Sequence, residues 1–199
     1  MKIVLENIGK RFNKEWIFRN VNYEFSAAKK YSILGTNGSG KSTLLQIIGG
    51  SLTQTEGNII SADPHANNSS TLSYAAPYLE LPEEMTWAEA VRFHGKFKKF
   101  VNGFNEEKII ELSGLKLSAE KEIRNFSSGM KQRAKLSLAI LSDTPLLLLD
   151  EPVTNLDENA VKWYQNLISE FAKDKLIIVC SNYNKGEYAF CPTECSLQL

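Results

Sequence analysis

Residues 35–43 read GTNGSGKST and fit G-x-x-x-x-G-K-[ST], the pattern of a phosphate-binding loop. An apolar run, Tyr31–Leu34, precedes the loop, and a helical pattern over Lys41–Ile48 follows it and stops at a pair of glycines. The three glycines of the loop permit a tight turn in which several backbone N–H groups point at one anion. The helix directs the positive end of its dipole toward the same anion. The stretch therefore predicts a strand, a loop and a helix that bind a nucleoside triphosphate.

Two side chains of this loop have roles of their own. Lys41 is long enough to reach the β- and γ-phosphates, and the hydroxyl of Ser42 is suited to ligate Mg²⁺. The candidate nucleotide-binding residues of the loop are Gly35, Thr36, Asn37, Gly38, Ser39, Gly40, Lys41, Ser42 and Thr43.

Residues 146–152 read LLLLDEP, so that a wholly apolar strand ends in two carboxylates. In open α/β sheets, ligands bind at the carboxyl edge of the strands. Asp150 is suited to hold Mg²⁺, directly or through water, and Glu151 to polarise an attacking water. By itself the pair could simply cap the strand before Pro152. The phosphate loop upstream favours a catalytic site.

A second apolar strand ends in a polar pair. Residues 175–184 read KLIIVCSNYN, in which Leu176–Cys180 run into Ser181 and Asn182. Such a strand end often faces a ligand, although Asn182 could also merely close a turn.

The amino-acid composition argues against several classes of protein. The 199 residues carry 23 Lys and Arg against 23 Asp and Glu, so a strong nucleic-acid footprint is not expected. The sequence contains no apolar stretch of the length that a membrane span requires. Three cysteines do not suggest a disulfide framework, and the CPTEC segment lacks the spacing of a zinc site. We expect a cytosolic protein of one compact domain.

Strand and helix patterns alternate along the rest of the chain. The unalternated runs LLLL and LIIV are typical of parallel strands covered on both faces. The aromatic residues Trp87, Phe93 and Phe97 recur within a helical pattern that starts at Thr86 and extends to Val101, and this stripe favours a core over an interface. The other predicted segments are strands at 3–7, 17–25, 58–61 and 71–75, a polar loop at 62–70, and helices at 106–112, 129–141 and 159–171.

Two further stretches indicate a family. Residues 125–133 read NFSSGMKQR and residues 154–157 read TNLD. Together with the phosphate loop, the helical insert and the acidic strand end, in this order, they resemble the ATP-binding cassette (ABC) ATPases over nearly the whole chain. FSSGMKQR is similar to the family signature LSGGQ-x-Q-R, but Phe126 replaces Leu, Ser128 replaces the first Gly and Met130 replaces Gln.

The resemblance implies a fold and a function. The fold is α/β, a P-loop NTPase (RecA-like) core at 1–82 and 143–199 with an antiparallel β subdomain and an inserted α-helical subdomain at about 83–142. The function is that of the ATP-binding and ATP-hydrolysing subunit of an ABC transporter, cytoplasmic and peripheral on the inner face of the cell membrane. ATP and Mg²⁺ would be its cofactors. Closure of a dimer, of two copies or with another cassette, would drive a separate membrane-spanning subunit, whose coupling helix would dock in a groove of the insert.

The resemblance also assigns individual residues. Ser127, Ser128 and Gly129 would contact the γ-phosphate of ATP held by the partner cassette, and Asp157 would lie near the partner's phosphate loop. Phe12, in the stretch GKRFNKEW, would stack on adenine, with Trp16 as the alternative aromatic.

Two positions depart from the family pattern. Tyr78 stands where the family has the Gln that reaches Mg²⁺ and the attacking water, so it is the third candidate residue of the metal site. Asn182 stands where the family has a His that contacts the γ-phosphate. Asn182 can still donate an N–H but cannot carry a charge or shuttle a proton. These departures predict slowed hydrolysis. They also leave open an alternative, a regulatory subunit gated by nucleotide with marginal turnover.

Overall fold

The structure is a computed structural model that describes residues 1–61 and 71–196. The chain forms two compact units. The core unit comprises Met1–Tyr74, Pro145–Glu151 and Asp174–Leu199, and the helical unit comprises Ala75–Thr144 and Pro152–Lys173. The polar loop predicted at 62–70 lies outside the described residues. Within the described ranges, none of the helices has the length and hydropathy needed to cross a membrane.

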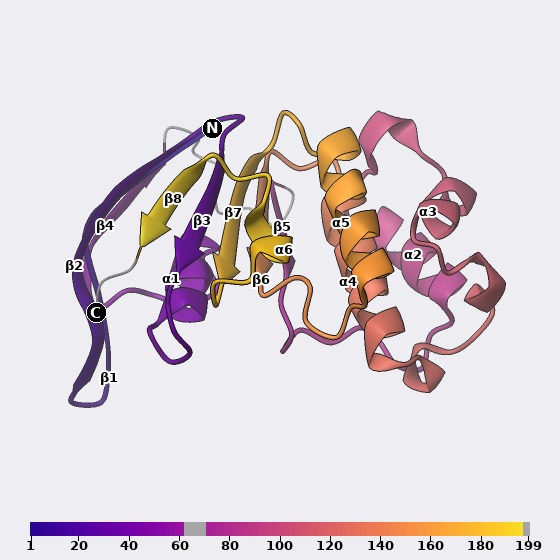
Figure 1. Cartoon of the computed structure of the whole chain (residues 1–199), viewed down its shortest axis with the longest axis horizontal. Helices are drawn as coiled ribbons and strands as arrows, with labels where there is room; N and C mark the ends of the chain where they lie inside the picture. Colours follow the sequence, from indigo (N-terminus) through magenta and orange to yellow (C-terminus); the bar gives the residue numbers. More distant parts are fainter. Residues whose placement is uncertain (62–70, 197–199) are drawn as a thin grey trace. The chain divides into compact units, whose positions relative to one another are not determined.

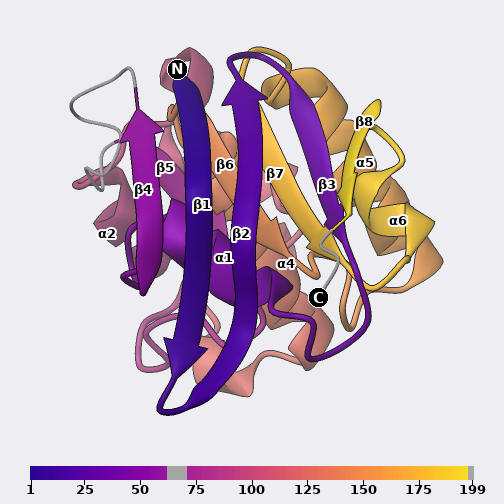
Figure 2. The ribbon, with the colours of Figure 1, turned by 90° about the vertical axis from the view of Figure 1, so that its left-hand side faces the viewer.

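An antiparallel sheet forms one layer of the core unit. Its strands are β1 (Lys2–Phe12), β2 (Glu15–Ser26) and β4 (Glu56–Ser61), in the order β2-β1-β4 (Figure 2). β1 and β2 are longer than predicted because a bulge interrupts their alternation. There Asn7 has a positive φ of 50°, and its backbone N–H donates to the side chain of Asn22 at 2.8 Å.

The second layer of the core unit is a five-stranded sheet in the order β5-β6-β7-β3-β8. β3 pairs in parallel with β7 and β8, and β6 pairs in parallel with β7, as predicted. Every residue of β6 and of β7 is buried, which is why these runs show no alternation. The strands are β3 (Lys30–Leu34), β5 (Leu72–Ala75), β6 (Leu146–Asp150), β7 (Leu176–Ser181) and β8 (Thr193–Ser196).

Helix α1 (Lys41–Ile48) joins the two sheets into one core. Its apolar residues Leu44, Leu45, Ile47 and Ile48 belong to a single cluster with buried side chains from β1, β2, β3, β6 and β7. The bounds of α1 agree with those predicted. The short helix α6 (Lys185–Tyr188) and strand β8 were not predicted.

The helical unit contains the helices α2, α3, α4 and α5 (Figure 1). α4 and α5 pack on one another, and α2 contacts both α3 and α4. α2 begins with a capping box, in which the Thr86 hydroxyl accepts from Glu89 N and the Glu89 carboxylate accepts from Thr86 N. The helices are α2 (Trp87–Gly95), α3 (Glu106–Leu112), α4 (Ser128–Leu141) and α5 (Glu158–Phe171), with short 3₁₀ turns at Val101–Gly103, Lys116–Ser118 and Ile123–Asn125.

The predicted helix from Thr86 to Val101 was too long, and its aromatic stripe is not a core stripe. α2 ends at Gly95, where the carbonyl of His94 accepts from Phe97 N and Lys98 N and closes the last turn. Trp87 is fully buried, but 43% of Phe93 and 69% of Phe97 are exposed. The helical spacing alone could not show whether these rings face the core or the solvent.

His94 at the end of α2 is held in its neutral form. Its Nε2 lies 2.7 Å from the hydroxyl of Ser142, which donates to the carbonyl of Leu138 and is therefore an acceptor for His94, and its ring stacks on Phe100. Burial, with a smaller contribution from Lys98, lowers the pKa of His94 to about 4.

We predict that His94 makes stability fall in mild acid. Its folded-state pKa lies below the unfolded value, so its contribution is complete above about pH 6.5 and is lost as the pH falls toward 4, by about 3 kcal/mol at most. In chemical unfolding at pH 7 and pH 4.5, His94→Gln should show a smaller loss between the two pH values than the wild type. An equal loss in both proteins would contradict the buried neutral ring.

Candidate nucleotide-binding site

The phosphate loop connects the end of β3 to the start of α1, as predicted. Gly38 and Gly40 have positive φ values of 83° and 93°, and the N–H of Ser39 donates to the carbonyl of Thr36 at 3.2 Å. Gly40 is the N-cap of α1, and no side chain accepts a hydrogen bond at this cap. The first N–H groups of the helix are therefore available to an anion.

Lys41 is held directly over this loop. Only 4% of the residue is exposed, and its Nζ donates to the carbonyls of Gly35 at 2.9 Å and Thr36 at 2.8 Å. The two carbonyls keep a positive charge at the loop where the β- and γ-phosphates of a nucleotide would lie.

Asp150, the last residue of β6, carries a buried carboxylate. Only 2% of it is exposed, and its Oδ1 has no hydrogen-bonding partner among the described residues. Burial raises the pKa of Asp150, and Glu151 raises it further, whereas a hydrogen bond with Ser42 and the charge of Lys41 lower it. An unpaired carboxylate oxygen beside a serine hydroxyl suits Mg²⁺, which prefers oxygen ligands and would compensate the buried charge. These residues fit the ion that the phosphate loop implies.

Glu151 follows Asp150 in a left-handed conformation with a φ of 42°. Its N–H donates to the carbonyl of Cys180 at 3.0 Å, which fixes the start of this turn to β7. Glu151 lines a hollow of about 240 Å³ together with residues of the phosphate loop and β2, namely Ile17, Asn37, Gly38, Gly40, Lys41, Ser42 and Thr43. A carboxylate thus lines the hollow into which a terminal phosphate would fit.

Asn182 is exposed at the end of β7, one residue beyond a direct link to the phosphate loop. The carbonyl of Ser181 accepts from the N–H of Gly35 at 3.4 Å, and Ser181 pairs in register with Leu34. The hydroxyl of Ser181 also accepts from Asn184 N at 3.1 Å and shapes the turn that contains Asn182. The core unit therefore brings both polar strand ends to the edge where the phosphate loop begins.

Of the two candidate aromatics for adenine, Phe12 is the more available. It lies at the end of β1 and is 46% exposed, and the ammonium of Lys10 lies over its ring, 4.9 Å from the centroid. The ring of Trp16 is engaged by Arg19 at 4.1 Å and Arg11 at 5.2 Å. Stacking of adenine on Phe12 stays a prediction.

Ile17 is a residue of the site that the sequence did not indicate. A Cβ added at Gly40 would lie 2.6 Å from Cγ2 of Ile17 and 2.8 Å from the ring of Phe18. β2 therefore packs closely against the phosphate loop. An isoleucine in a strand gives no signal of such a contact.

The signature segment lies in the helical unit and begins α4. The Ser127 hydroxyl accepts from Met130 N and caps the helix, while Ser127 and Ser128 are exposed. Phe126, which replaces the family's leucine, is buried, so the larger ring is accommodated in the core of this unit. A Cβ at Gly129 would lie 3.0 Å from the carbonyl of Asn155, so glycine permits this close approach.

Further contacts involve the signature helix and the segment that runs from Pro152 into α5. Buried Gln132 of α4 donates from Nε2 to the carbonyl of Pro152 at 2.7 Å. Asp157 is the N-cap of α5 and accepts from Ala160 N at 2.8 Å. The guanidinium of Arg133 stacks on Trp163 at 4.6 Å. Gln132 was not singled out in the sequence, although it belongs to the signature motif.

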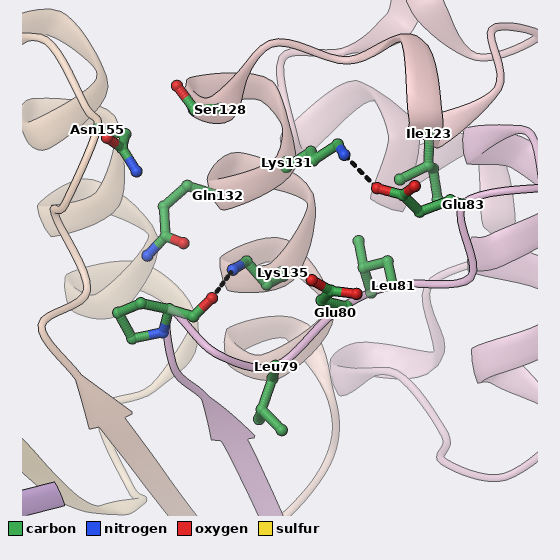
Figure 3. Close-up of a pocket in the computed structure, with 11 residues that line it drawn as sticks. Leu79, Glu80, Leu81, Glu83, Ile123, Ser128, Lys131, Gln132, Lys135 and Asn155 are labelled. Atoms are coloured by element: carbon green, nitrogen blue, oxygen red, sulfur yellow. Dashed lines mark hydrogen bonds and ion pairs between the residues drawn. The ribbon is translucent and has the colours of Figure 1, made fainter.

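Tyr78 lies in the turn after β5, on the helical unit, and is 49% exposed. Next to it is a second hollow of about 190 Å³ between residues 77–83 and α4 (Figure 3). In this hollow the ammonium of Lys131 pairs with Glu83, and Lys135 donates to the carbonyl of Pro77 at 3.1 Å. The lining residues are Pro77, Leu79, Glu80, Leu81, Glu83, Ile123, Ser128, Lys131, Gln132, Lys135 and Asn155.

We predict that two glycines of the phosphate loop respond differently to a methyl group. Both have a positive φ, but an added Cβ clashes with Ile17 and Phe18 at Gly40 and meets nothing within 4 Å at Gly38. In thermal unfolding without nucleotide, Gly40→Ala should cost about 1–3 kcal/mol more than Gly38→Ala. Equal losses would mean that β2 does not support the loop.

Comparison with known proteins gives the family. The ABC transporter family model matches residues 18–154. The energy-coupling factor transporter ATP-binding protein EcfA1 of Thermotoga maritima is 33% identical over 164 residues, which are 79% of this chain and 63% of the relative. The lantibiotic transport ATP-binding protein SrtF of Streptococcus pyogenes is 27% identical over 188 residues, 92% of this chain and 80% of the relative. The chain thus spans less than two thirds of the Thermotoga protein.

Solved structures share the fold. A dimeric ATP-binding cassette in a post-hydrolysis state, bound to ADP and phosphate, superposes with a TM-score of 0.84 at 22% identity, over 98% of this chain and 94% of that chain. The fold is therefore the P-loop NTPase fold of ABC cassettes, with its antiparallel and parallel sheets and its helices. Because the family model covers most of the sequence, the chain belongs to the ABC transporter family, as one of its ATP-binding cassettes.

Proposed function

We propose that the chain binds and hydrolyses ATP as the motor subunit of an ABC transporter and drives transport through a separate membrane-spanning subunit. The observation that supports this most is the shared hollow of the core unit, in which Lys41, Ser42 and Glu151 all take part. This arrangement provides a cation for the phosphates and a carboxylate for an attacking water. The relatives from Thermotoga and Streptococcus are both transport ATP-binding proteins by name.

Different residues bind the nucleotide, hold the metal ion and activate the attacking water in this proposal. The N–H groups of the phosphate loop and the ammonium of Lys41 bind the phosphates, and Phe12 stacks on the base. Ser42 and Asp150 would hold Mg²⁺, which when bound supplies positive charge to the phosphate oxygens. Glu151 accepts the proton of the attacking water, and Asn182 donates an N–H at the γ-phosphate side.

The signature acts across a dimer of cassettes in this proposal. Ser127 and Ser128 are exposed at the N-terminus of α4, so they are accessible to the ATP of a partner cassette, with Gly129 beside them. Asp157 caps α5 and would lie near the partner's phosphate loop. The partner is a second copy or another cassette that restores the family's residues.

The second hollow is the candidate dock for the membrane subunit. Leu79 is 37% exposed at its edge, and the paired charges of Lys131 and Glu83 offer polar contacts (Figure 3). A coupling segment that binds here would contact the turn of Tyr78 and the signature helix together. The cassette would then lie at the inner face of the cell membrane. No nucleic-acid partner is proposed, because the chain has no net charge.

A regulatory subunit is the second candidate. Tyr78 and Asn182 both replace residues with which the family positions the attacking water and the γ-phosphate. In this alternative, ATP controls dimerisation and turnover is marginal.

We predict that the purified chain hydrolyses ATP with Mg²⁺ and that Glu151→Gln lowers the rate by about 10²-fold or more, because the general base is lost. Asn182→His should raise the rate, by at most about 10- to 150-fold, since it adds one hydrogen bond to a charged group. Steady-state phosphate release measures both effects. If ATP binds but wild type and Glu151→Gln have the same background rate, the regulatory function is favoured for the isolated chain.

We also predict that Asp150 mediates the effect of Mg²⁺. In the wild type, ATP with Mg²⁺ should raise the unfolding temperature more than ATP with EDTA, because the ion adds binding energy to the folded state only. Asp150→Asn should abolish most of this difference while keeping the effect of ATP with EDTA. Persistence of the full Mg²⁺ effect in Asp150→Asn would rule out this residue as a ligand.

A further inference from the structure

Two phenylalanine rings lie on the surface of the helical unit at the end of α2. Phe93 is 43% exposed and Phe97 is 69% exposed, and their ring centroids are 5.0 Å apart. The other side of the same helix buries Trp87 and Val91 completely. The two rings therefore form a single apolar feature that the fold does not cover within the described residues.

Basic residues surround this pair. Residues 90–105 contain Arg92, Lys96, Lys98 and Lys99 and no Asp or Glu, in a chain with equal numbers of acidic and basic residues. Lys96 and Lys99 are exposed and form no ion pair with any other described residue.

Neighbouring acids do not neutralise the segment. The guanidinium of Arg92 is held by Glu106 through two hydrogen bonds of 3.0 and 2.9 Å. Asp143 also lies beside the segment, since its N–H donates to the carbonyl of Lys99 at 2.8 Å. Glu89 of α2 stands three residues before Arg92. Four cations against these three acids leave an excess of one positive charge.

We propose that Phe93, Lys96, Phe97 and Lys99, here named the aromatic–basic patch, bind the anionic headgroups of a lipid bilayer. Exposed aromatic rings beside lysines are the composition with which peripheral proteins bind membrane surfaces, because the rings enter the headgroup region while the ammonium groups stay at the phosphates. The charge excess selects anionic over zwitterionic lipid. This contact would add to any protein–protein contact with a membrane subunit and does not depend on ATP hydrolysis.

The contribution of each lysine and the screening by salt set the expected strength of lipid binding. Each lysine near an anionic surface contributes about fivefold in binding, and the attraction falls off within a Debye length of about 10 Å at moderate ionic strength. Binding through two exposed lysines and two rings should therefore be weak, reversible and sensitive to salt.

The test is co-sedimentation of the full chain with vesicles of phosphatidylcholine alone and of phosphatidylcholine mixed with phosphatidylglycerol. We expect binding to the anionic vesicles only, with loss at high salt. The double variant Lys96→Glu, Lys99→Glu should lower binding by more than about tenfold. The matched control is Lys162→Glu with Lys173→Glu, two exposed lysines of the same unit, which gives the same net charge and should retain most of the binding.

A second pair of variants tests the rings. Phe93→Ser with Phe97→Ser should lower binding to anionic vesicles, whereas Leu117→Ser, at a fully exposed leucine, should not. ATP binding by each variant confirms that it is folded.

Three outcomes would overturn the proposal. They are no binding of the wild type to anionic vesicles, an equal loss in the patch and control lysine variants, and wild-type binding by the phenylalanine variant. Capture of an acidic amphipathic peptide without vesicle binding would instead assign the patch to a protein partner. Loss of vesicle binding with ATPase activity intact would leave the proposed motor function untouched.

Discussion

The register of three parallel strands is the constraint on which the site depends. Asp150 is paired with Cys180, and Leu34 with Ser181, so β6, β7 and β3 end at the same level. Two backbone bonds complete this edge, from Glu151 N to the carbonyl of Cys180 and from Gly35 N to that of Ser181. A slip of one residue in either pairing would turn alternate side chains to the opposite face of the sheet and separate the acids from the phosphate loop.

Much of this edge could be predicted from the sequence, because each part has a local signal. The runs LLLL and LIIV are long and apolar enough to be buried strands. The spacing of the glycines before Lys41 indicates a phosphate-binding loop. The contact of Ile17 with the loop has no such signal, since it depends on how the antiparallel sheet packs on α1. The bulge at Asn7 was also missed, and because it interrupts the alternation of β1, that strand was predicted too short.

In the helical unit, the ends of the elements were harder to predict. The pattern from Thr86 was helical, but Gly95 and the bonds to the His94 carbonyl end α2 earlier. Phe97 then lies beyond the end of α2, whereas Phe93 lies within α2 on its exposed side. The short segments β8 and α6 carry little periodicity, and β8 is set by its pairing with β3.

Two buried charges in the core unit are incompletely compensated. The Nζ of Lys41 donates to two carbonyls, and one oxygen of Asp150 has no partner among the described residues. Such arrangements lower the stability of the free protein and favour a state in which a polyanion and a divalent cation are present.

The contacts of α4 with the TNLD segment have a mechanical consequence. The backbone of Gly129 closely approaches the carbonyl of Asn155 in TNLD, and Gln132 donates to the carbonyl of Pro152, two residues before TNLD. These contacts couple the signature helix to the segment that leads into α5. In the dimer proposed above, a displacement of the signature would therefore also displace the cap of α5, so the two contacts proposed with the opposing nucleotide would change together.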